Sequence, residues 1–447
     1  MLTKEENQLI TLTGPGTPGG DLMRCYWHPV ALSEELPPGG APMPLKILGE
    51  ELVLFRDEHG RPGLLGLYCS HRCADLSYGR IENGGLRCLY HGWLYDIHGR
   101  CLEQPAEPPE SHYKDQIRHL SYPLIERGGA LFAYMGKGEP PLLPGYECLS
   151  AEAEHIHVRK GFMECNYFQA LEGDIDPAHL SYLHLSWKRR RVRRKGTVPG
   201  GSKTAGRLHA EDRRPRLESE HTDFGVRNYA IRDAGDGQRY IRINNFLMPN
   251  KIASVGNEGR VGEGYTIHWH VPIDDENHVR FDFFFNRAHP ISRERYEEEA
   301  ATETVENRFL RNKRNRFLQD REEMKTTNFS GMGDSNAVQD AWATETPGPI
   351  HDRSREHLAT SDVHIVAARR RLLEGVAAVA AGRDPIHVIR DPERNDMSHI
   401  VVLSEVIPAA ADHRELWKGR MQKPPAHGAS APRGPSAWRR AEAGKAG

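Results

Sequence analysis

The sequence predicts an α+β protein in which a small antiparallel β domain precedes a larger mixed domain. In the first third of the chain, short apolar runs such as 52–55 alternate with turns rich in glycine, which is typical of short antiparallel strands. The composition changes at the proline-rich segment 140–144. Beyond it, longer runs of alternating polarity and helical patterns indicate a sheet flanked by helices.

Length and composition limit the class of protein. The 447 residues are enough for more than one domain. We expect an N-terminal segment with the small domain at 1–144, a second domain at 145–420 and a disordered tail at 421–447, which is rich in Pro, Ala, Gly and Arg. The formal net charge of -2 provides no general attraction to nucleic acid.

Cysteine usage and hydropathy indicate the compartment. The seven cysteines suggest no disulfide framework, which fits a reducing environment. The start of the chain lacks the apolar core of a secretory signal, and no apolar run reaches the ~18 residues of a membrane helix. We therefore expect a cytoplasmic protein without a membrane or nucleic-acid partner.

Two short loops in the small domain carry the clearest chemical signal. Sixteen residues separate Cys69-Ser-His71 from Cys88-Leu-Tyr-His91, so each loop supplies one thiolate and one imidazole. This division places two sulfurs on one metal and two nitrogens on a second, as a Rieske [2Fe–2S] centre requires. A Cys₂His₂ zinc site is the alternative, although zinc knuckles usually pair cysteines. An iron assay and a visible spectrum distinguish the two.

The second domain is expected to contain these elements in order. A helix covers 164–184, and strands cover 240–249 and 265–287, the latter interrupted by a turn at 274–277. Strong charge with helical periodicity predicts a helix at 292–324. Ser361 is the expected N-cap of a helix that runs to residue 381 and ends at Gly382.

A second candidate metal site lies on the first of these helices. His179 and His184 follow several carboxylates, and Asp340 offers a third ligand. Two histidines and one carboxylate form the open site of non-haem iron oxygenases. Positions i and i+5 diverge by about 140° on a regular helix, so we predict a π-type widening between the histidines. On spacing alone, a solvated surface helix explains the histidine segment equally well, and an ordinary acid at a helix N-terminus is the favoured interpretation of Asp340.

Both constellations together resemble the α subunits of Rieske non-haem iron aromatic ring-hydroxylating oxygenases, in the branch of the phthalate 4,5-dioxygenases and phenoxybenzoate dioxygenases. The likeness runs from about residue 23 to about 362 and includes 78–88 (Tyr-Gly-Arg-Ile-Glu-Asn-Gly-Gly-Leu-Arg-Cys), 170–174 (Ala-Leu-Glu-Gly-Asp) and 348–358. It implies a Rieske β domain followed by a helix-grip (START-like) domain with an antiparallel sheet and flanking helices. Cys73 stands where many relatives have glycine.

The resemblance also implies roles for single residues. The [2Fe–2S] cluster would be held by Cys69, His71, Cys88 and His91, and a mononuclear Fe(II) by His179, His184 and Asp340. Asp176 falls on the family's bridging aspartate, which would link His91 of a neighbouring subunit to His179. Such a bridge requires a ring of subunits, so a homotrimer or a pair of stacked trimers is expected.

The activity implied by the resemblance is hydroxylation of an aromatic carboxylate, of the phthalate or benzoate type, with O₂. Electrons would come from NADH through a separate reductase component that carries a flavin, a ferredoxin or both. Arg207 and Arg242 are candidates for binding the substrate carboxylate by a bidentate fork, although either could be solvated or ion-paired.

Other functions remain open at this point. A Rieske monooxygenase, either an O-demethylase or a hydroxylase, would use the same ligands. A pure electron-transfer Rieske protein and a zinc-dependent nucleic-acid binder are more remote. The basic run 188–195 is interpreted as a mobile loop rather than a nucleic-acid patch, because it has no interleaved aromatic residues.

Overall fold

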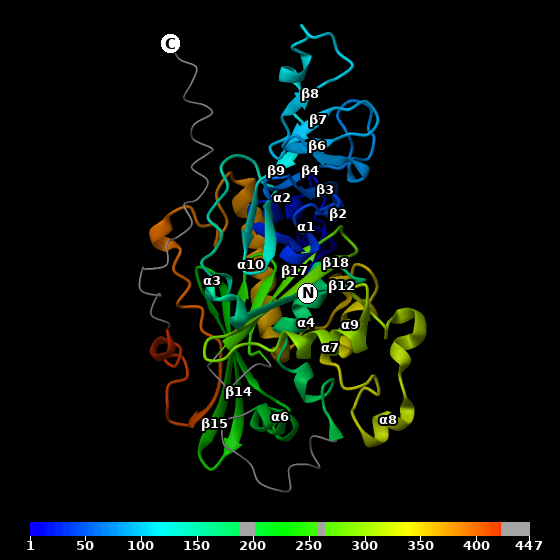
Figure 1. Cartoon of the computed structure of the whole chain (residues 1–447). Helices are drawn as coiled ribbons and strands as arrows, with labels where there is room; N and C mark the ends of the chain where they lie inside the picture. The colour runs from blue at the N-terminus through cyan, green and yellow to red at the C-terminus, as the bar shows by residue number, and fades with distance from the viewer. Residues whose placement is uncertain (188–201, 257–263, 422–447) are drawn as a thin grey trace.

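The computed structural model describes residues 1–187, 202–256 and 264–421, and it confirms the predicted α+β class (Figure 1). The sheet of strands β5 to β8 lies in a lobe at one end of the molecule, and the β14–β15 hairpin lies at the other end (Figure 1). The predicted loop at 188–195 and all but the first residue of the predicted tail fall outside the described residues.

The small domain consists of antiparallel strands. One sheet has the order β2 (Met43–Ile47), β3 (Glu50–Arg56), β4 (Pro62–Gly66), β9 (Ser121–Tyr122), and a second has β5 (Arg80–Glu82), β6 (Gly85–Arg87), β7 (Leu94–Asp96), β8 (Cys101–Glu103). A third sheet joins β1 (Trp27–Leu32), β11 (Ala130–Tyr134) and β10 (Leu124–Arg127). Phe55, Leu65 and Leu86 belong to a core that also contains Cys69 and Cys88, so the first two sheets close around the cysteine loops.

One large antiparallel sheet forms the second domain, in the order β12 (Ile156–Met163), β18 (His278–Asn286), β17 (Gly264–Pro272), β16 (Lys251–Ser254), β15 (Gln238–Leu247), β14 (Gly225–Gly235), β13 (Arg216–His221). Strand β21 (Leu403–Pro408) pairs with β15. The strands predicted at 240–249 and 265–287 are confirmed, including the turn between β17 and β18.

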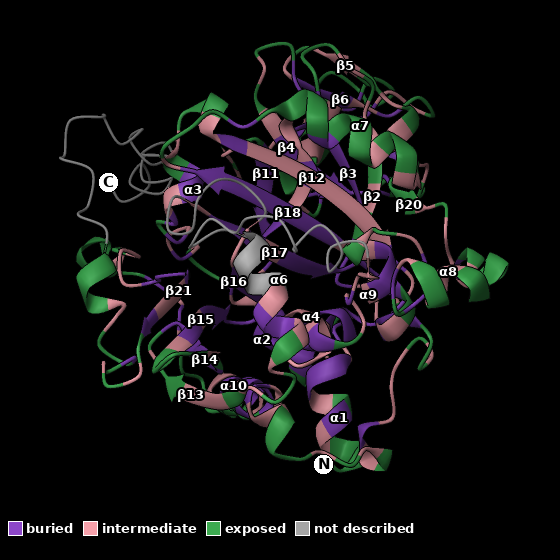
Figure 2. Cartoon of the chain, turned by 90° about the horizontal axis from the view of Figure 1, so that it is seen from below, coloured by how far each residue is buried: buried purple, intermediate pink, exposed green. Residues whose placement is uncertain are grey.

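The second domain also contains helices. They are α3 (Glu147–Ser150), α4 (Tyr167–Ile175), α6 (Ser202–Glu211), α7 (Arg293–Glu303), α8 (Arg321–Thr326), α9 (Asn336–Glu345) and α10 (Val363–Ala380). Among them, α3, α4, α6 and α10 contact the sheet. Helix α4 is largely buried (Figure 2), and it packs against β17 and α9. The N-terminal helices α1 (Lys4–Thr11) and α2 (Pro18–Arg24) also contact α10, so the start of the chain packs on the second domain.

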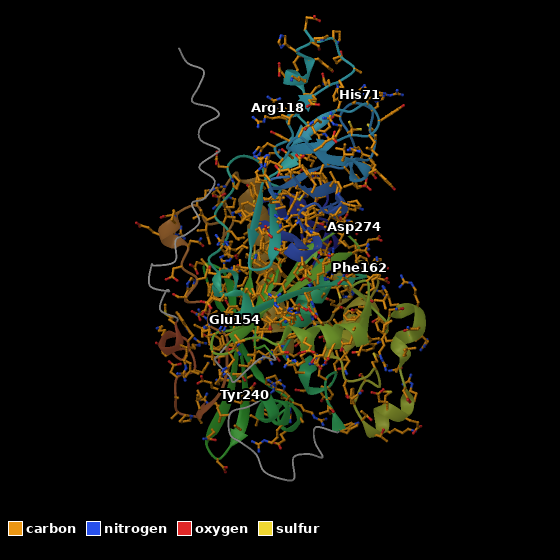
Figure 3. All side chains as sticks on the ribbon, viewed as in Figure 1. His71, Arg118, Glu154, Phe162, Tyr240 and Asp274 are labelled. Atoms are coloured by element: carbon orange, nitrogen blue, oxygen red, sulfur yellow. The ribbon has the colours of Figure 1, made fainter. Side chains whose placement is uncertain are left out.

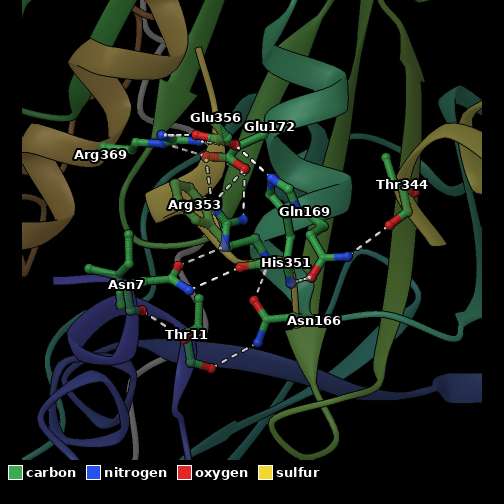
Figure 4. Close-up of polar contacts among 12 residues, drawn as sticks. Asn7, Thr11, Asn166, Gln169, Glu172, Thr344, His351, Arg353, Glu356 and Arg369 are labelled. Carbon is green, nitrogen blue, oxygen red and sulfur yellow. Dashed lines mark hydrogen bonds and ion pairs between the residues drawn. The ribbon is translucent and has the colours of Figure 1, made fainter. Parts of the chain in front are cut away.

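A buried ionic network connects these helices behind α4 (Figure 4). Glu172 of α4 accepts hydrogen bonds from Arg353 at 2.7 Å and from Arg369 of α10 at 2.6 Å. Arg369 also donates to Glu356 at 2.6 Å, and Arg353 donates to Asn7 of α1 at 3.0 Å. Two carboxylates therefore compensate two buried guanidinium groups, and the network fixes the last turn of α4 to α1 and α10.

The helix predicted at 164–184 is wrong in its second half. Helix α4 ends at Ile175, and Asp176 has extended backbone angles (φ -72°, ψ 118°). Pro177 follows, and a residue before proline is disfavoured in the helical region. His179 begins a separate 3₁₀ turn, His179–Ser181, so the predicted π-type widening is also wrong. The turn, instead of a distorted helix, brings the two histidines together.

Two other helix predictions need correction. The segment 292–324 contains α7, the short strands β19 (Thr304–Val305) and β20 (Arg308–Phe309), a 3₁₀ segment and α8, because Glu306 and Asn307 adopt positive φ in a turn. The N-cap of α10 is Asp362 and not Ser361. The expected end of that helix is confirmed, since Gly382 has a φ of +68°.

Candidate iron–sulfur and mononuclear iron sites

The two cysteine loops of the small domain have the same backbone geometry. Cys69 N–H donates to Ala74 C=O at 2.9 Å, and Cys88 N–H donates to Trp93 C=O at 2.9 Å. Each loop therefore closes five residues after its cysteine and presents most of the intervening residues on the surface of the lobe. His71 is labelled there in Figure 3.

Each loop also has one residue with positive φ, four positions after the cysteine. In the second loop this residue is Gly92, with a φ of +76°. In the first loop it is Cys73, with a φ of +56° and an exposed side chain. Glycine adopts this conformation without steric cost, whereas other residues do not. The conformation of the loop therefore imposes backbone strain at Cys73.

The four side chains suit a Rieske cluster. Cys69 and Cys88 are buried, with 2% and 4% exposure, whereas His71 is exposed. The His71 and His91 rings lie 4.4 Å apart between centroids, and Trp93 stacks on His71 at 4.6 Å. Burial, together with the neighbouring Cys69, raises the pKa of the Cys88 thiol. Two buried sulfurs in this state need a cation to hold them as thiolates, and two imidazoles complete the Rieske donor set.

The second constellation joins two segments of the larger domain. His179 and His184 lie on the turns after α4, and Asp340 lies on α9. One ligand atom from each residue lies within 4.8 Å of the other two. His184 Nε2 is 3.0 Å from Asp340 Oδ1, and His179 Nε2 is 3.8 Å from the same oxygen. The fold thus brings together the three ligands predicted from the sequence, and the Nε2 atoms of both histidines face the carboxylate of Asp340.

Neighbouring residues determine the tautomers of these histidines. Gln339 Nε2 donates to Gly333 C=O at 2.7 Å, so Gln339 Oε1 faces His184 Nδ1 at 2.7 Å. An amide oxygen can only accept, so His184 carries its proton on Nδ1 and leaves Nε2 free to bind a metal. Asp176 Oδ2 lies 3.5 Å from His179 Nδ1 and orders that ring in the same way. The supporting role of Gln339 was not predicted, because neither its spacing nor its type suggested it.

Several cationic groups lie near the histidines. Burial lowers the pKa of His209 on α6 to about 2, and the charges of Arg232 and Arg242 and of the two candidate ligands contribute to this shift. Arg242 is half-buried on β15, and burial lowers its pKa. Its recorded polar contact is a weak one to Asn244 Oδ1 at 3.5 Å, and no carboxylate of the described chain lies within ion-pair distance. Neither His209 nor Arg232 was predicted from the sequence.

Arg207 has a different environment from Arg242. Its side chain is 40% exposed on α6 and lies 3.6 Å from Glu211, one turn along the same helix. The two arginines proposed from the sequence as substrate-binding residues therefore differ in their ion pairing. Arg242 has no acidic partner among the described residues, whereas Arg207 already has one.

Comparisons with known proteins agree with this geometry. A model of the Rieske [2Fe-2S] domain matches residues 26–123, and a model described as LigXa C-terminal domain like matches residues 133–430. The phthalate 4,5-dioxygenase oxygenase subunit of Pseudomonas putida is 38% identical over 418 residues, which cover 86% of this chain and 89% of the relative. The phenoxybenzoate dioxygenase subunit alpha of Ectopseudomonas oleovorans is 35% identical and covers 85% and 87%.

A relative with a different reaction is also similar. The 5,5'-dehydrodivanillate O-demethylase oxygenase subunit of a Sphingobium species is 32% identical over 93% of this chain and 88% of the relative. Among solved structures, dicamba monooxygenase has a TM-score of 0.55 at 19% identity, covering 80% of this chain and 98% of that one. A carbazole 1,9a-dioxygenase oxygenase–ferredoxin complex has a TM-score of 0.54 at 20% identity, covering 87% and 96%. These structures support the fold.

The cluster loops, the two-domain fold and these relatives define an iron–sulfur oxidoreductase that activates oxygen. The chain belongs to the Rieske oxygenases, as an oxygenase component of the group that acts on aromatic compounds. The predicted family and branch are thereby confirmed. Among the described residues, no helix is both long and apolar enough to cross a membrane.

Proposed function

We propose that this protein is the oxygenase component of a multi-component dioxygenase that hydroxylates an aromatic carboxylate of the phthalate or benzoate type with O₂. NADH would supply the electrons through a separate reductase with a flavin, a ferredoxin or both. The carbazole 1,9a-dioxygenase oxygenase, which shares the fold, is known in complex with a ferredoxin. The identities of the relatives named above support an aromatic acid as the substrate class.

His179, His184 and Asp340 are proposed to hold a mononuclear Fe(II), which when bound would activate O₂ for insertion into the ring. The donor set fits, because two neutral imidazoles and one carboxylate occupy one side of a metal and leave other positions open. Gln339 and Asp176 hold the rings so that both Nε2 atoms remain unprotonated. The carboxylate of Asp340 compensates part of the metal's charge.

Asp176 is proposed to connect this site with the cluster of a neighbouring subunit. Within one chain, the cluster loops lie in the upper lobe, whereas α4 and α9 lie in the lower part (Figures 1 and 3). A trimer in which His91 of one subunit approaches Asp176 of the next would shorten the electron path. Asp176→Asn should keep both metals and slow cluster reoxidation in a single turnover. An unchanged rate would exclude the bridge.

The proposed substrate class rests mainly on the environment of Arg242. A half-buried guanidinium without an acidic partner costs free energy unless an anion binds it. A substrate carboxylate would supply that anion by a bidentate contact and would hold the ring near the iron ligands. Arg207 remains a second candidate, although it would have to leave Glu211 first.

The test is an aerobic screen of the reconstituted oxygenase with phthalates, benzoates and phenoxybenzoates, scored by product. Arg242→Gln should raise KM for the accepted acid by about 10-fold or more, as expected for the loss of a charged hydrogen bond of 1.5–3 kcal/mol. Arg239→Gln, on the same strand, serves as the matched control. No product from any acid, or equal KM values for Arg242→Gln and the parent, would contradict the proposal.

A monooxygenase is the second candidate function. The similarity to the dehydrodivanillate O-demethylase favours it, since that relative covers 93% of this chain. Turnover under ¹⁸O₂ separates the two reactions. A dioxygenase places both labelled atoms in the product, whereas a monooxygenase places one there and releases the other as water.

A further inference from the structure

A chain of three titratable side chains lies beside the candidate iron ligands and takes no part in holding them. Asp174 on α4 contacts His270 on β17, with Oδ2 and Nε2 2.8 Å apart. His270 Nδ1 lies 3.1 Å from His278 Nε2 on β18. His278 Nδ1 lies 2.8 Å from the backbone oxygen of Cys165. Both imidazoles are fully buried, and each of their four nitrogens has a partner.

The number of protons on this chain follows from its contacts. A carbonyl oxygen can only accept, so His278 carries a proton on Nδ1. A second proton must lie between His278 and His270, because two lone pairs would otherwise face each other. A third must lie between His270 and Asp174 for the same reason. Two neutral imidazoles carry only two protons, so the chain holds one additional proton and has no net charge.

Surrounding charges bear on which group of the chain holds the additional proton. A second set of charged side chains lies on the same sheet. Asp282 of β18 contacts His268 at 2.6 Å, Arg280 at 3.0 Å and Arg159 at 3.3 Å. Burial, and after it the neighbouring basic groups, Arg280 among them, lower the pKa of His278 and of His270, and the carboxylate of Asp174 opposes this at both. Burial works against ionisation of Asp174, yet its pKa is lowered because His268, His270 and Arg280 surround it. Although the pKa of each imidazole is lowered, the hydrogen-bond pattern requires the additional proton, and the lowered pKa of Asp174 leaves the imidazole pair to hold it.

Asp174 is the end of the chain that lies toward the iron ligands. It is two residues before Asp176 on the same backbone, and its side chain is 14% exposed. Asp176 in turn contacts His179, with Oδ2 and Nδ1 3.5 Å apart, and the negative charge of Asp174 helps to raise the pKa of His179 against the effect of burial. The second oxygen of Asp174 has no protein partner among the described residues, so it is free to exchange a proton with water.

We propose that Asp174, His270 and His278 form a proton store that supplies one proton to oxygen reduction at the adjacent site. The storage of a proton is inferred from these contacts alone, whereas delivery of that proton to oxygen also depends on the proposed function. In ring dihydroxylation, the O–O bond of O₂ breaks and two C–O bonds form. Two electrons come from NADH through the reductase, and two protons end on the hydroxyl oxygens. The store provides one of these protons through Asp174 and is reloaded from solvent.

Neutron diffraction from deuterated crystals of the oxidised holoenzyme tests the storage directly. Deuterons are expected at His278 Nδ1, between His278 and His270, and between His270 and Asp174. In Asp174→Asn the amide can donate to His270, so two neutral imidazoles suffice and His270 Nε2 should be bare. A chain with only two deuterons in the unaltered protein would overturn the proposal, and this measurement does not depend on any variant folding.

A single turnover of the reduced holoenzyme with phthalate as probe tests the use of the proton. Asp174→Asn should slow product formation by roughly 10²-fold, the lower range for loss of a general acid, and change the solvent isotope effect. Glu218→Gln breaks a comparable pair with His413 (3.1 Å) and should leave the isotope effect unchanged. Unaltered rate and isotope effect in Asp174→Asn would refute the delivery step. Absence of any product from the parent protein would contradict the proposed substrate class, and the deuteron count would still stand.

Discussion

Replacing Gln339 by leucine would remove the residue that orients the candidate metal ligand His184 while leaving the ligand itself in place. Gln339 is 2% exposed and makes two hydrogen bonds of 2.7 Å, one with His184 Nδ1 and one with Gly333 C=O. Leucine keeps most of the volume but makes neither bond. His184 could then carry its proton on Nε2, the atom that faces Asp340.

The expected effect on metal binding is large. Loss of an outer partner of a metal-bound histidine typically costs 10–100-fold in affinity, which is about 1.4–2.8 kcal/mol of binding free energy. Unfolding should become easier by about 1–3 kcal/mol for each buried group left without a partner. Gln339→Glu should retain most of the metal affinity, because a carboxylate still accepts from His184 Nδ1.

The assay is titration of iron-depleted protein with Fe(II) under anaerobic conditions against a chelator of known affinity. The visible spectrum of the cluster should not change. Gln169→Leu is the matched control, since Gln169 is also a buried glutamine but donates to Thr344 C=O at 2.8 Å and Gly348 C=O at 2.9 Å and makes no hydrogen bond with a candidate ligand. The reasoning fails if Gln339→Leu binds Fe(II) as tightly as the parent, or if Gln169→Leu loses affinity equally.

Three further predictions concern stability. Glu172→Gln should lower the free energy of unfolding by about 3–5 kcal/mol in urea titrations, because Arg353 and Arg369 would remain buried without their shared carboxylate; a change below 1 kcal/mol would show that the network is not a net stabiliser of α4. Cys73→Gly should stabilise the protein by about 0.5–1 kcal/mol, since it removes the steric cost at a φ of +56°, and the cluster spectrum should persist; destabilisation would mean that the thiol has a structural contact. Burial lowers the pKa of His28 and of His387 to about 3, whereas unfolded histidine titrates near 6.5. The unfolded chain therefore binds more protons between these values, and the free energy of unfolding should fall as pH decreases below about 6.5, by up to about 1.4 kcal/mol per pH unit for each histidine; a flat profile between pH 6.5 and 5 would contradict this assignment.

Local sequence patterns were sufficient for the elements whose structure depends on near neighbours. The cysteine loops close through bonds between residues five positions apart, and the β17–β18 hairpin follows from its alternation and its turn. The end of α10 at Gly382 was also predictable, because glycine accepts positive φ without strain.

Predictions failed where one residue interrupts a regular pattern. Helical periodicity continues through His184, but Pro177 ends α4 and a 3₁₀ turn replaces the predicted distortion. The alternation of polar and apolar residues in β17 also does not reveal that His270 is completely buried, with Asp174 of α4 against it, while His268 stays partly exposed. Burial of a strand face depends on what packs against it, which a strand's own pattern does not contain.

The sequence by itself indicated the kind of chemistry, because thiolates and imidazoles at fixed short spacings suit only certain metal centres. Tertiary structure decided which groups support that chemistry. Gln339 reaches His184, and Asp174 reaches His270, across separations of 155 and 96 residues. Hydrogen bonds act over about 3 Å, so partners this distant along the chain meet only after the sheet and helices have packed.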